Sequence, residues 1–224
     1  MFDFFVGIDF SINSPAVCVF NTHEETYQFF SFVNDGGRSA NKPLPPGMGL
    51  YQNLPGVVIE RYSRHKGSKI YEEDQLQKIE DAEDIVCMIG NLFNFNGQSV
   101  CYGLEGFSYG SKGNSFIDLI MFNSMLRYAI WKNLEPGDEF KIMTPSYIKK
   151  NAGKGNANKN QMLSYFLDSK EASLQENDFW KFCSAQSSSL IDKNEKVIKP
   201  IDDLVDSYFI CDALRSNIVP LKNC

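Results

Sequence analysis

Two aspartates near the C-terminus, Asp203 and Asp206, are spaced so that both lie on one edge of a helix. The apolar residues around them cover most of the helix circumference, so the acids fill a narrow gap and not a broad solvated face. These apolar residues are Ile201, Leu204, Val205, Tyr208, Phe209, Ile210, Cys211, Ala213 and Leu214. Carboxylates so close together raise one another's pKa unless a cation neutralises them, as a divalent metal ion would. The alternative is the solvated edge of an ordinary packed helix.

Two further acids end predicted strands. Asp9 follows the apolar run FFVGI, and Glu105 follows the run SVCYGL. In an open α/β sheet the carboxyl ends of parallel strands line the ligand crevice, so these side chains converge if their strands are neighbours. Carboxylate oxygens are the ligands that hard divalent cations prefer. A lone acid at a strand end is more often a turn residue, so the four acids support a metal site only as a group.

Apolar periodicity predicts the elements that position these acids. Three strands at the start are expected to form a meander, and two later strands alternate with helices, which predicts an α/β sheet flanked by helices. The expected strands are 4–10, 15–21, 26–33, 98–107 and 138–145. The expected helices are 69–93, 114–133, 158–168, with Asn158 as N-cap, and 199–217. Residues 34–56, rich in Gly, Pro and Asn, and the polar residues 169–198 are interpreted as insertions.

The charge of the chain is unevenly distributed. A net charge of −6 argues mildly against nucleic-acid binding, because phosphate neutralisation needs lysine and arginine. Residues 141–159 nevertheless carry five lysines and no acid, and residues 61–69 carry four further positive charges. Such tracts favour local binding of a polyanion, although solvated basic loops are an equal alternative.

Composition and cysteine usage exclude several classes of protein. With 224 residues, 43% of them hydrophobic, the chain can build one substantial core. No apolar run is long enough to cross a membrane, and the N-terminus lacks a basic leader, so we expect a cytoplasmic protein. Six scattered cysteines without a CxxC pair indicate reduced thiols, and only two histidines argue against a histidine-rich metal site.

Four pieces of the chain resemble RuvC-type Holliday junction resolvases, members of the RNase H-like nuclease superfamily. They are GIDFSINSPAVCV, GLEGF, TPSYIKKNAGKGNANKNQM and DDLVDSYFICDAL. The third is the most specific, because its proline, lysine pair, glycine-rich turn and Ala-x-Lys-x-Gln helix start come in the family's order. The resemblance implies a mixed sheet, a three-strand meander plus parallel strands, flanked by helices. It also implies one nuclease domain over 1–224, with insertions at about 34–56 and 169–198.

By this resemblance Asp9, Glu105, Asp203 and Asp206 are the catalytic, metal-binding acids. They would hold two Mg²⁺ ions, with Mn²⁺ expected to substitute, and hydrolyse phosphodiester bonds of four-way DNA junctions. Two metal ions can serve the attacking and leaving oxygens of such a reaction, and no histidine base is needed. Asp202 is the rival to Asp203, because spacings of three and four both keep a pair on one helix face. The family's D-x-x-D pattern favours Asp203.

The resemblance also implies how DNA is bound. The residues expected to touch the DNA backbone are Lys149, Lys150, Lys154 and Lys159. Phe107 or Tyr109 would stack on an unpaired base, although the family places that aromatic three positions after the Glu, where this chain has Ser108. Both aromatics are equally expected as packing residues. A homodimer is expected because two symmetric strands must be cut. The apolar residues of 114–132 occupy more than the one face that a sheet can bury, so this segment is the expected contact.

Other functions remain open at the level of sequence. A nuclease of the same superfamily could act on flaps, other branched DNA or RNA hybrids, and a relative that binds junctions without cutting would keep the fold. The GIDFS strand also suits actin-like and sugar-kinase ATPases, but those need two such domains and a glycine-rich adenosine site. The insertions and acidic charge differ from compact, basic bacterial resolvases, so the resemblance extends to phage or viral versions, which would act in the host cytoplasm.

Overall fold

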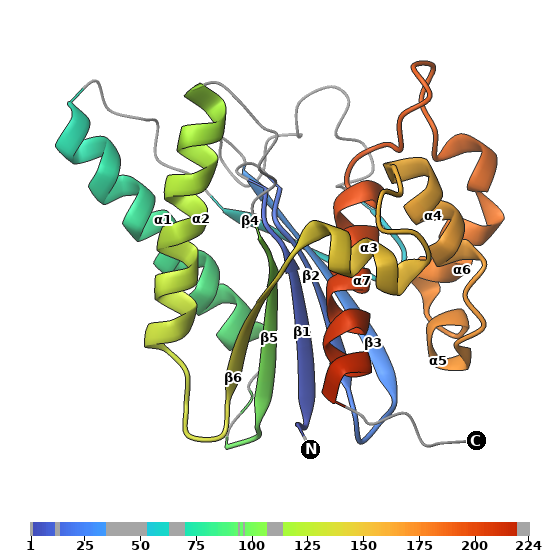
Figure 1. The fold of residues 1–224 in the computed structure, drawn as a ribbon, viewed down its shortest axis with the longest axis horizontal. Helices are drawn as coiled ribbons and strands as arrows, with labels where there is room; N and C mark the ends of the chain where they lie inside the picture. Colours follow the sequence, from blue (N-terminus) through green and yellow to red (C-terminus); the bar gives the residue numbers. More distant parts are fainter. Residues whose placement is uncertain are drawn as a thin grey trace.

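The computed structural model describes residues 2–11, 14–34, 53–62, 70–93, 95, 97–106 and 114–218. Within them the chain builds a six-stranded mixed sheet with helices on both faces (Figure 1). In spatial order the strands are β4 (Val57–Tyr62), β3 (Thr26–Asn34), β2 (Ala16–Asn21), β1 (Phe4–Asp9), β5 (Val100–Glu105) and β6 (Glu139–Met143).

The strand pairing confirms the predicted fold class. Strands β1, β2 and β3 form an antiparallel meander, whereas β5 pairs parallel to β1 and β6 parallel to β5. The carboxyl ends of β1 and β5 therefore meet at one edge of the sheet, as the acids at their ends require. Strand β4, parallel to β3, was not predicted. It lies at the edge of the sheet, where Val58 is 44% exposed and a continuous apolar run is not needed.

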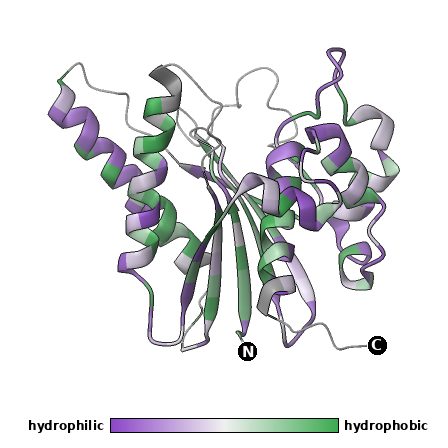
Figure 2. Cartoon of the chain, viewed as in Figure 1, coloured by the Kyte–Doolittle hydropathy of each residue, from purple (hydrophilic) through white to green (hydrophobic). Residues whose placement is uncertain are grey.

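Helices cover the two faces of the sheet with separate apolar cores. Helices α1 (Tyr71–Phe93) and α2 (Asn114–Lys132) cover one face, and α7 (Ile201–Ile218) lies on the other, with further helices packed beyond it (Figure 1). The hydrophobic residues concentrate in the inner strands, while α1 is largely hydrophilic (Figure 2). All nine apolar residues predicted to pack α7 are buried. No helix in the described part of the chain is long and apolar enough to span a membrane.

The segment after β6 corrects one predicted boundary and contains a helix that was not predicted. The strand ends at Met143, not at residue 145, and Pro145 begins helix α3 (Pro145–Ala152), with Thr144 as N-cap. Proline suits the first helical position because its missing N–H has no helical partner there. Helix α4 (Lys159–Leu167) begins where expected, and Asn158 caps it in a capping box with Gln161.

Residues 169–198 are more structured than their polar sequence indicated. They form helices α5 (Ala172–Gln175) and α6 (Asp178–Ala185), the short 3-10 helix η2 (Ser187–Ser189) and a hairpin closed by Ile191 and Val197. The side chains that anchor them in the core are Leu174, Phe179, Cys183 and Leu190. Helices this short carry too few turns to display periodicity. Most of the other expected insertion, residues 35–52, lies outside the described residues.

Helix α2 carries more apolar side chains than the sheet covers. Phe122, Leu126 and Ile130 are buried against the sheet, so the predicted contact of residues 114–132 with another chain would use the other side of the helix. Tyr128 and Trp131 are 58% and 64% exposed. An apolar surface is therefore left on the outer side of α2.

Candidate active site

Two glycines set how closely α7 approaches the sheet. Gly7 of β1 and Gly103 of β5 are partners in the parallel register. A Cβ atom on Gly7 would lie 2.3 Å from the Ser207 carbonyl oxygen and 2.4 Å from the Cys211 nitrogen, and one on Gly103 would lie 2.6 Å from the Leu214 side chain. The backbone of α7 thus packs almost directly on the backbone of β1, as only glycine allows.

This close packing brings four acids together. Asp9 ends β1, Glu105 ends β5, and Asp203 and Asp206 lie on the first two turns of α7, which begins at the same edge of the sheet. Burial raises the pKa of Asp9 well above its usual range, and the negative charges of Asp206, Asp203 and Glu105 raise it further. The four predicted acids therefore form one electrostatic cluster.

Burial and neighbouring charges also raise the pKa values of Glu105 and Asp206. Burial and then the charge of Asp206 raise the pKa of Glu105, against the opposing effect of Lys159 and Lys149. Burial likewise raises the pKa of Asp206, opposed mainly by Lys159. Holding several carboxylates in a partly enclosed place is costly unless cations accompany them. The site consequently depends on positive charge.

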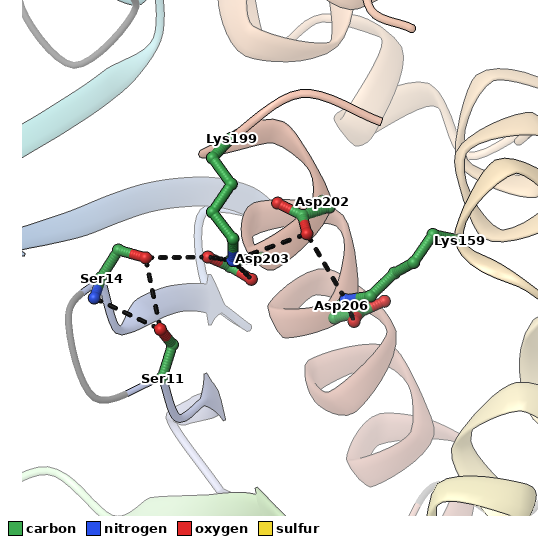
Figure 3. Close-up of polar contacts among 7 residues, drawn as sticks. All are labelled: Ser11, Ser14, Lys159, Lys199, Asp202, Asp203 and Asp206. Atoms are coloured by element: carbon green, nitrogen blue, oxygen red, sulfur yellow. Dashed lines mark hydrogen bonds and ion pairs between the residues drawn. The ribbon is translucent and has the colours of Figure 1, made fainter. Parts of the chain in front are cut away.

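Two lysines supply part of that charge in the absence of metal (Figure 3). Lys159, at the start of α4, pairs with Asp206 and lies 3.9 Å from Asp202. Burial acts to lower the pKa of Lys159, but the carboxylates of Asp206 and Asp9 raise it more, so its ammonium stays charged. Lys199 places its Nζ 2.6 Å and 2.5 Å from the two carboxylate oxygens of Asp203.

Asp203 is the most completely enclosed of these acids. It is 3% exposed, and Ser14, in the turn after β1, donates its hydroxyl to Asp203 Oδ2 at 3.0 Å. The Ser11 and Ser14 hydroxyls are 3.3 Å apart (Figure 3). Sequence reasoning missed Ser14 and Lys199. A signal existed for Lys199, which lies four residues before Asp203 and so one helical turn away.

The rival Asp202 lies on the outer side of the cluster. Its carboxylate is 3.6 Å from Lys199 and 3.9 Å from Lys159, and its Oδ1 is buried without a hydrogen-bond partner. Burial and then the charge of Asp203 raise its pKa. The carboxylates that most strongly raise the pKa of Asp9 are those of Asp206 and Asp203. This geometry favours Asp203 as the acid that faces Asp9.

The chemistry of the donors fits hard divalent cations. Carboxylates of Asp9, Glu105, Asp203 and Asp206 would hold them, and Asp202 Oδ1, buried without a hydrogen-bond partner, is a further acceptor. Within the described ranges, no three acidic, histidine or cysteine side chains lie in a metal-binding arrangement, and lysine ammonium groups pair with Asp203 and Asp206. Metal binding would therefore require these lysines to share or release the acids.

The predicted DNA-binding residues divide into three groups. Lys149 and Lys159 lie at the acids, where their charges act on Glu105 and Asp206. Lys150, on the last turn of α3, and Lys154, in the turn before α4, are exposed. Phe107 and Tyr109 lie outside the described residues.

Comparison with known proteins finds a likeness only among solved structures. No family model matches the sequence. No curated protein matches it either. A Thermus thermophilus RuvC structure is 14% identical, with 94% of this chain and 92% of that chain covered and a TM-score of 0.40. The yeast mitochondrial Holliday junction resolvase Ydc2 is 14% identical, with 93% and 76% covered and a TM-score of 0.45.

A fowlpox virus resolvase, solved with substrate Holliday junction DNA, is 12% identical, with 97% of this chain and 99% of that chain covered and a TM-score of 0.39. The chain is thus similar to these three structures in fold, at low sequence identity.

Proposed function

We propose that this chain is a metal-dependent nuclease that hydrolyses phosphodiester bonds of branched DNA, with the four-way junction as its preferred substrate. The observation that carries the proposal is the convergence of Asp9, Glu105, Asp203 and Asp206 from three separate elements, with the pKa of Asp9 raised by burial and further by the other three acids. An assembly of mutually repelling acids is destabilising by itself, so its presence indicates a role that needs cations.

The residues suit such a reaction. These four acids would hold two Mg²⁺ ions, which would supply charge neutralisation for the attacking and leaving oxygens, and Mn²⁺ is expected to substitute. Ser14 and Lys199 hold the carboxylate of Asp203 in one orientation. Lys159 keeps its positive charge beside Asp206 and Asp9, where it can also meet a phosphate oxygen.

The choice of branched DNA rests on the sequence resemblance and on the lysines. Lys149 and Lys159 lie at the acids, and Lys150 and Lys154 extend positive charge along the same surface from α3 to α4. Phosphate contacts of this kind position a duplex without reading its bases. A homodimer would present two such sites for two symmetric cuts.

A substrate panel tests the proposal. Four-way, flap, duplex and RNA–DNA hybrid substrates, each end-labelled, are incubated with the wild-type chain and Mg²⁺, then with a chelator. Asp9→Asn is the inactive variant, and Asp178→Asn, an exposed acid on α6, is the matched control. We expect cutting of the four-way junction by wild type and control only, and only with the metal.

Two results would contradict this function in different ways. Preferred cutting of flaps or hybrids would keep the nuclease and replace the substrate, which is the alternative that the sequence left open. Junction binding without cutting in either Mg²⁺ or Mn²⁺ would show a non-cleaving relative.

A further inference from the structure

A groove opens beside the acid cluster. It encloses about 1080 Å³ between the start of α4 and the hairpin that precedes α7. Two of its lining residues, Lys159 and Lys199, also bind Asp206 and Asp203, so the groove leads directly into the candidate active site. The remaining lining residues are Asn158, Asn160, Asp192, Glu195, Lys196, Val197, Ile198 and Asp202.

The hairpin wall of the groove is braced from within and from outside. The Asp192 carboxylate accepts the backbone N–H groups of Asn194 and Lys196 at 2.8 Å and 2.9 Å, which closes the tip. The Asn160 side chain donates from α4 to the Glu195 carbonyl oxygen at 2.9 Å, across the groove. At the base, Leu190 and Val197 are buried in the core. This wall is therefore preorganised.

Three lysines and three acids line the groove, namely Lys159, Lys196 and Lys199, and Asp192, Glu195 and Asp202. Asp192 is occupied by the turn, and Asp202 lies within 3.9 Å of both Lys159 and Lys199. Lys196 is exposed at the outer end, and the side chain of Lys199 is 51% exposed at the inner end. An anion entering the groove thus meets one ammonium group at each end.

We propose that this groove binds the sugar–phosphate backbone of the nucleic-acid strand that leads to the cleaved bond, with Lys196 as its outer contact. The inference deepens the proposed function and rests on it. A strand is the occupant because the groove is open at the surface and continuous with the acids, so a chain of phosphates can run from Lys196 past Lys199 to the site. The hairpin belongs to the insertion 169–198, which thereby acquires a role in substrate binding.

Charge reversal on the hairpin tests the proposal. Lys196→Glu is compared with Lys181→Glu, which makes the same charge change on α6, in the same insertion, away from the groove. Affinity for a fluorescent four-way junction and for a labelled single strand is measured in Ca²⁺ over a range of salt concentrations. We expect Lys196→Glu to weaken binding at least ~5-fold and to lower the salt slope by about one unit, as for one lost phosphate contact. Lys181→Glu should stay within about twofold of wild type.

Two further variants separate charge from shape. Asn160→Ala removes the brace of the hairpin without changing charge and should also weaken binding, whereas Lys196→Arg should keep wild-type affinity. If Lys196→Glu and Asn160→Ala both bind like Lys181→Glu, the groove does not hold the strand. That result can occur with a wild type that cuts junctions normally. If Lys196→Glu weakens binding but the wild type cuts no substrate, the nuclease function is overturned while the proposed binding role of the groove is supported.

Discussion

Asp203 illustrates how a buried carboxylate is held at this site. Lys199 reaches both of its oxygens and Ser14 a single one, so the acid has charge-assisted partners although it is 3% exposed. Removing one partner of a buried ion pair leaves an uncompensated charge, which costs more than the pair itself contributes. Lys199 and Ser14 therefore determine the orientation of Asp203.

The first prediction separates Asp203 from its neighbour Asp202. Asp203→Asn should reduce the cleavage rate at least ~100-fold, because bound metal supplies several kcal/mol of transition-state stabilisation and the variant loses a ligand. Asp202→Asn should stay within ~10-fold of wild type. Initial rates on the labelled four-way junction measure both, and junction affinity in Ca²⁺ serves as the folding control. The reverse order of rates would make Asp202 the ligand.

The second prediction concerns the pH dependence of stability. Because burial and the three other acids raise the pKa of Asp9 above its ordinary value of 3.8, the folded state binds its proton more tightly than the unfolded state. Without metal, stability should therefore fall as pH rises from about that ordinary value through the raised one. Asp9→Asn should have a higher Tm than wild type at pH 8, by about 2–4 °C per kcal/mol of repulsion relieved.

That gain should vanish at acidic pH, where Asp9 is protonated in both states, and should shrink when Mg²⁺ is added to the wild type. Thermal melts at several pH values, with and without the metal, provide the measurement. A constant gain at all pH values would show that charge repulsion is not its cause.

At the scale of elements, the docking of α7 on β1 controls the site. The helix buries nine apolar side chains and touches the strand backbone at Gly7, so its first turns have little freedom to move relative to Asp9. Burying a large apolar side chain contributes about 1.5–3 kcal/mol, which makes this interface the main support of the acids. The position of Asp203 and Asp206 is thus set by packing further along the helix.

The third prediction is that Gly7→Ala destabilises the protein and impairs the site together. The added Cβ would lie 2.3 Å from a backbone oxygen of α7, so the helix must shift, at a cost of about 1–3 kcal/mol or more. Gly90→Ala is the control, because a Cβ at this position in α1 meets nothing within 4 Å. It should raise stability by about 0.5–1 kcal/mol. Denaturant unfolding and cleavage rates are measured for both variants. If Gly7→Ala keeps wild-type stability and cleavage rate, the close packing of α7 on Gly7 does not position the acids.

The fourth prediction distinguishes the two parts of the lysine tract. Lys150→Ala with Lys154→Ala, on the exposed part, should weaken all DNA substrates similarly and make the salt dependence shallower by about one unit per lost contact. Lys149→Ala with Lys159→Ala should in addition reduce the cleavage rate at saturating DNA, because these two lysines act on Glu105 and Asp206. Wild-type affinity and slope in the four-lysine variant would place the DNA path elsewhere.

At the scale of the whole molecule, the outer surface of α1 and α2 carries apolar side chains that a monomer would leave exposed to water. A groove of about 410 Å³ lies between α1 and α2, with Ile79, Ile120, Met125 and Tyr128 among its lining residues. Beside it, Leu76 is 60% and Trp131 64% exposed. Contiguous apolar patches of this kind mark contact sites in soluble proteins. A second copy of the chain is the partner that the proposed reaction calls for.

The fifth prediction is that Tyr128→Glu with Trp131→Lys converts a dimer into a monomer. The two rings lie 6.2 Å apart on the outer side of α2, and introducing charges there removes apolar contact while leaving the sheet core intact. Light scattering measures the mass. Ile142→Lys, on the edge strand β6 and 50% exposed, is the control and should remain dimeric. An unchanged mass in the double variant would place the contact elsewhere.

The sequence by itself determined the parts of this protein that follow local rules. Alternating and continuous apolar runs located β1, β2, β3, β5 and the long helices, because burial on a sheet face requires them. The packing side of α7 was predicted correctly, since all nine of its predicted apolar positions are buried. Asn158 was recognised as a helix cap from the preferences of that position alone.

Only the tertiary structure decided what depends on contacts between distant residues. Ser14 reaches Asp203 because α7 packs beside the start of β2, a juxtaposition of residues 189 positions apart. Glycine is required at positions 7 and 103 because α7 packs directly against them. The helices of 169–198 are stabilised by the side chains that they bury in the core. Periodicity reports which side of an element is buried, but not against what, so these features could not be read from the sequence.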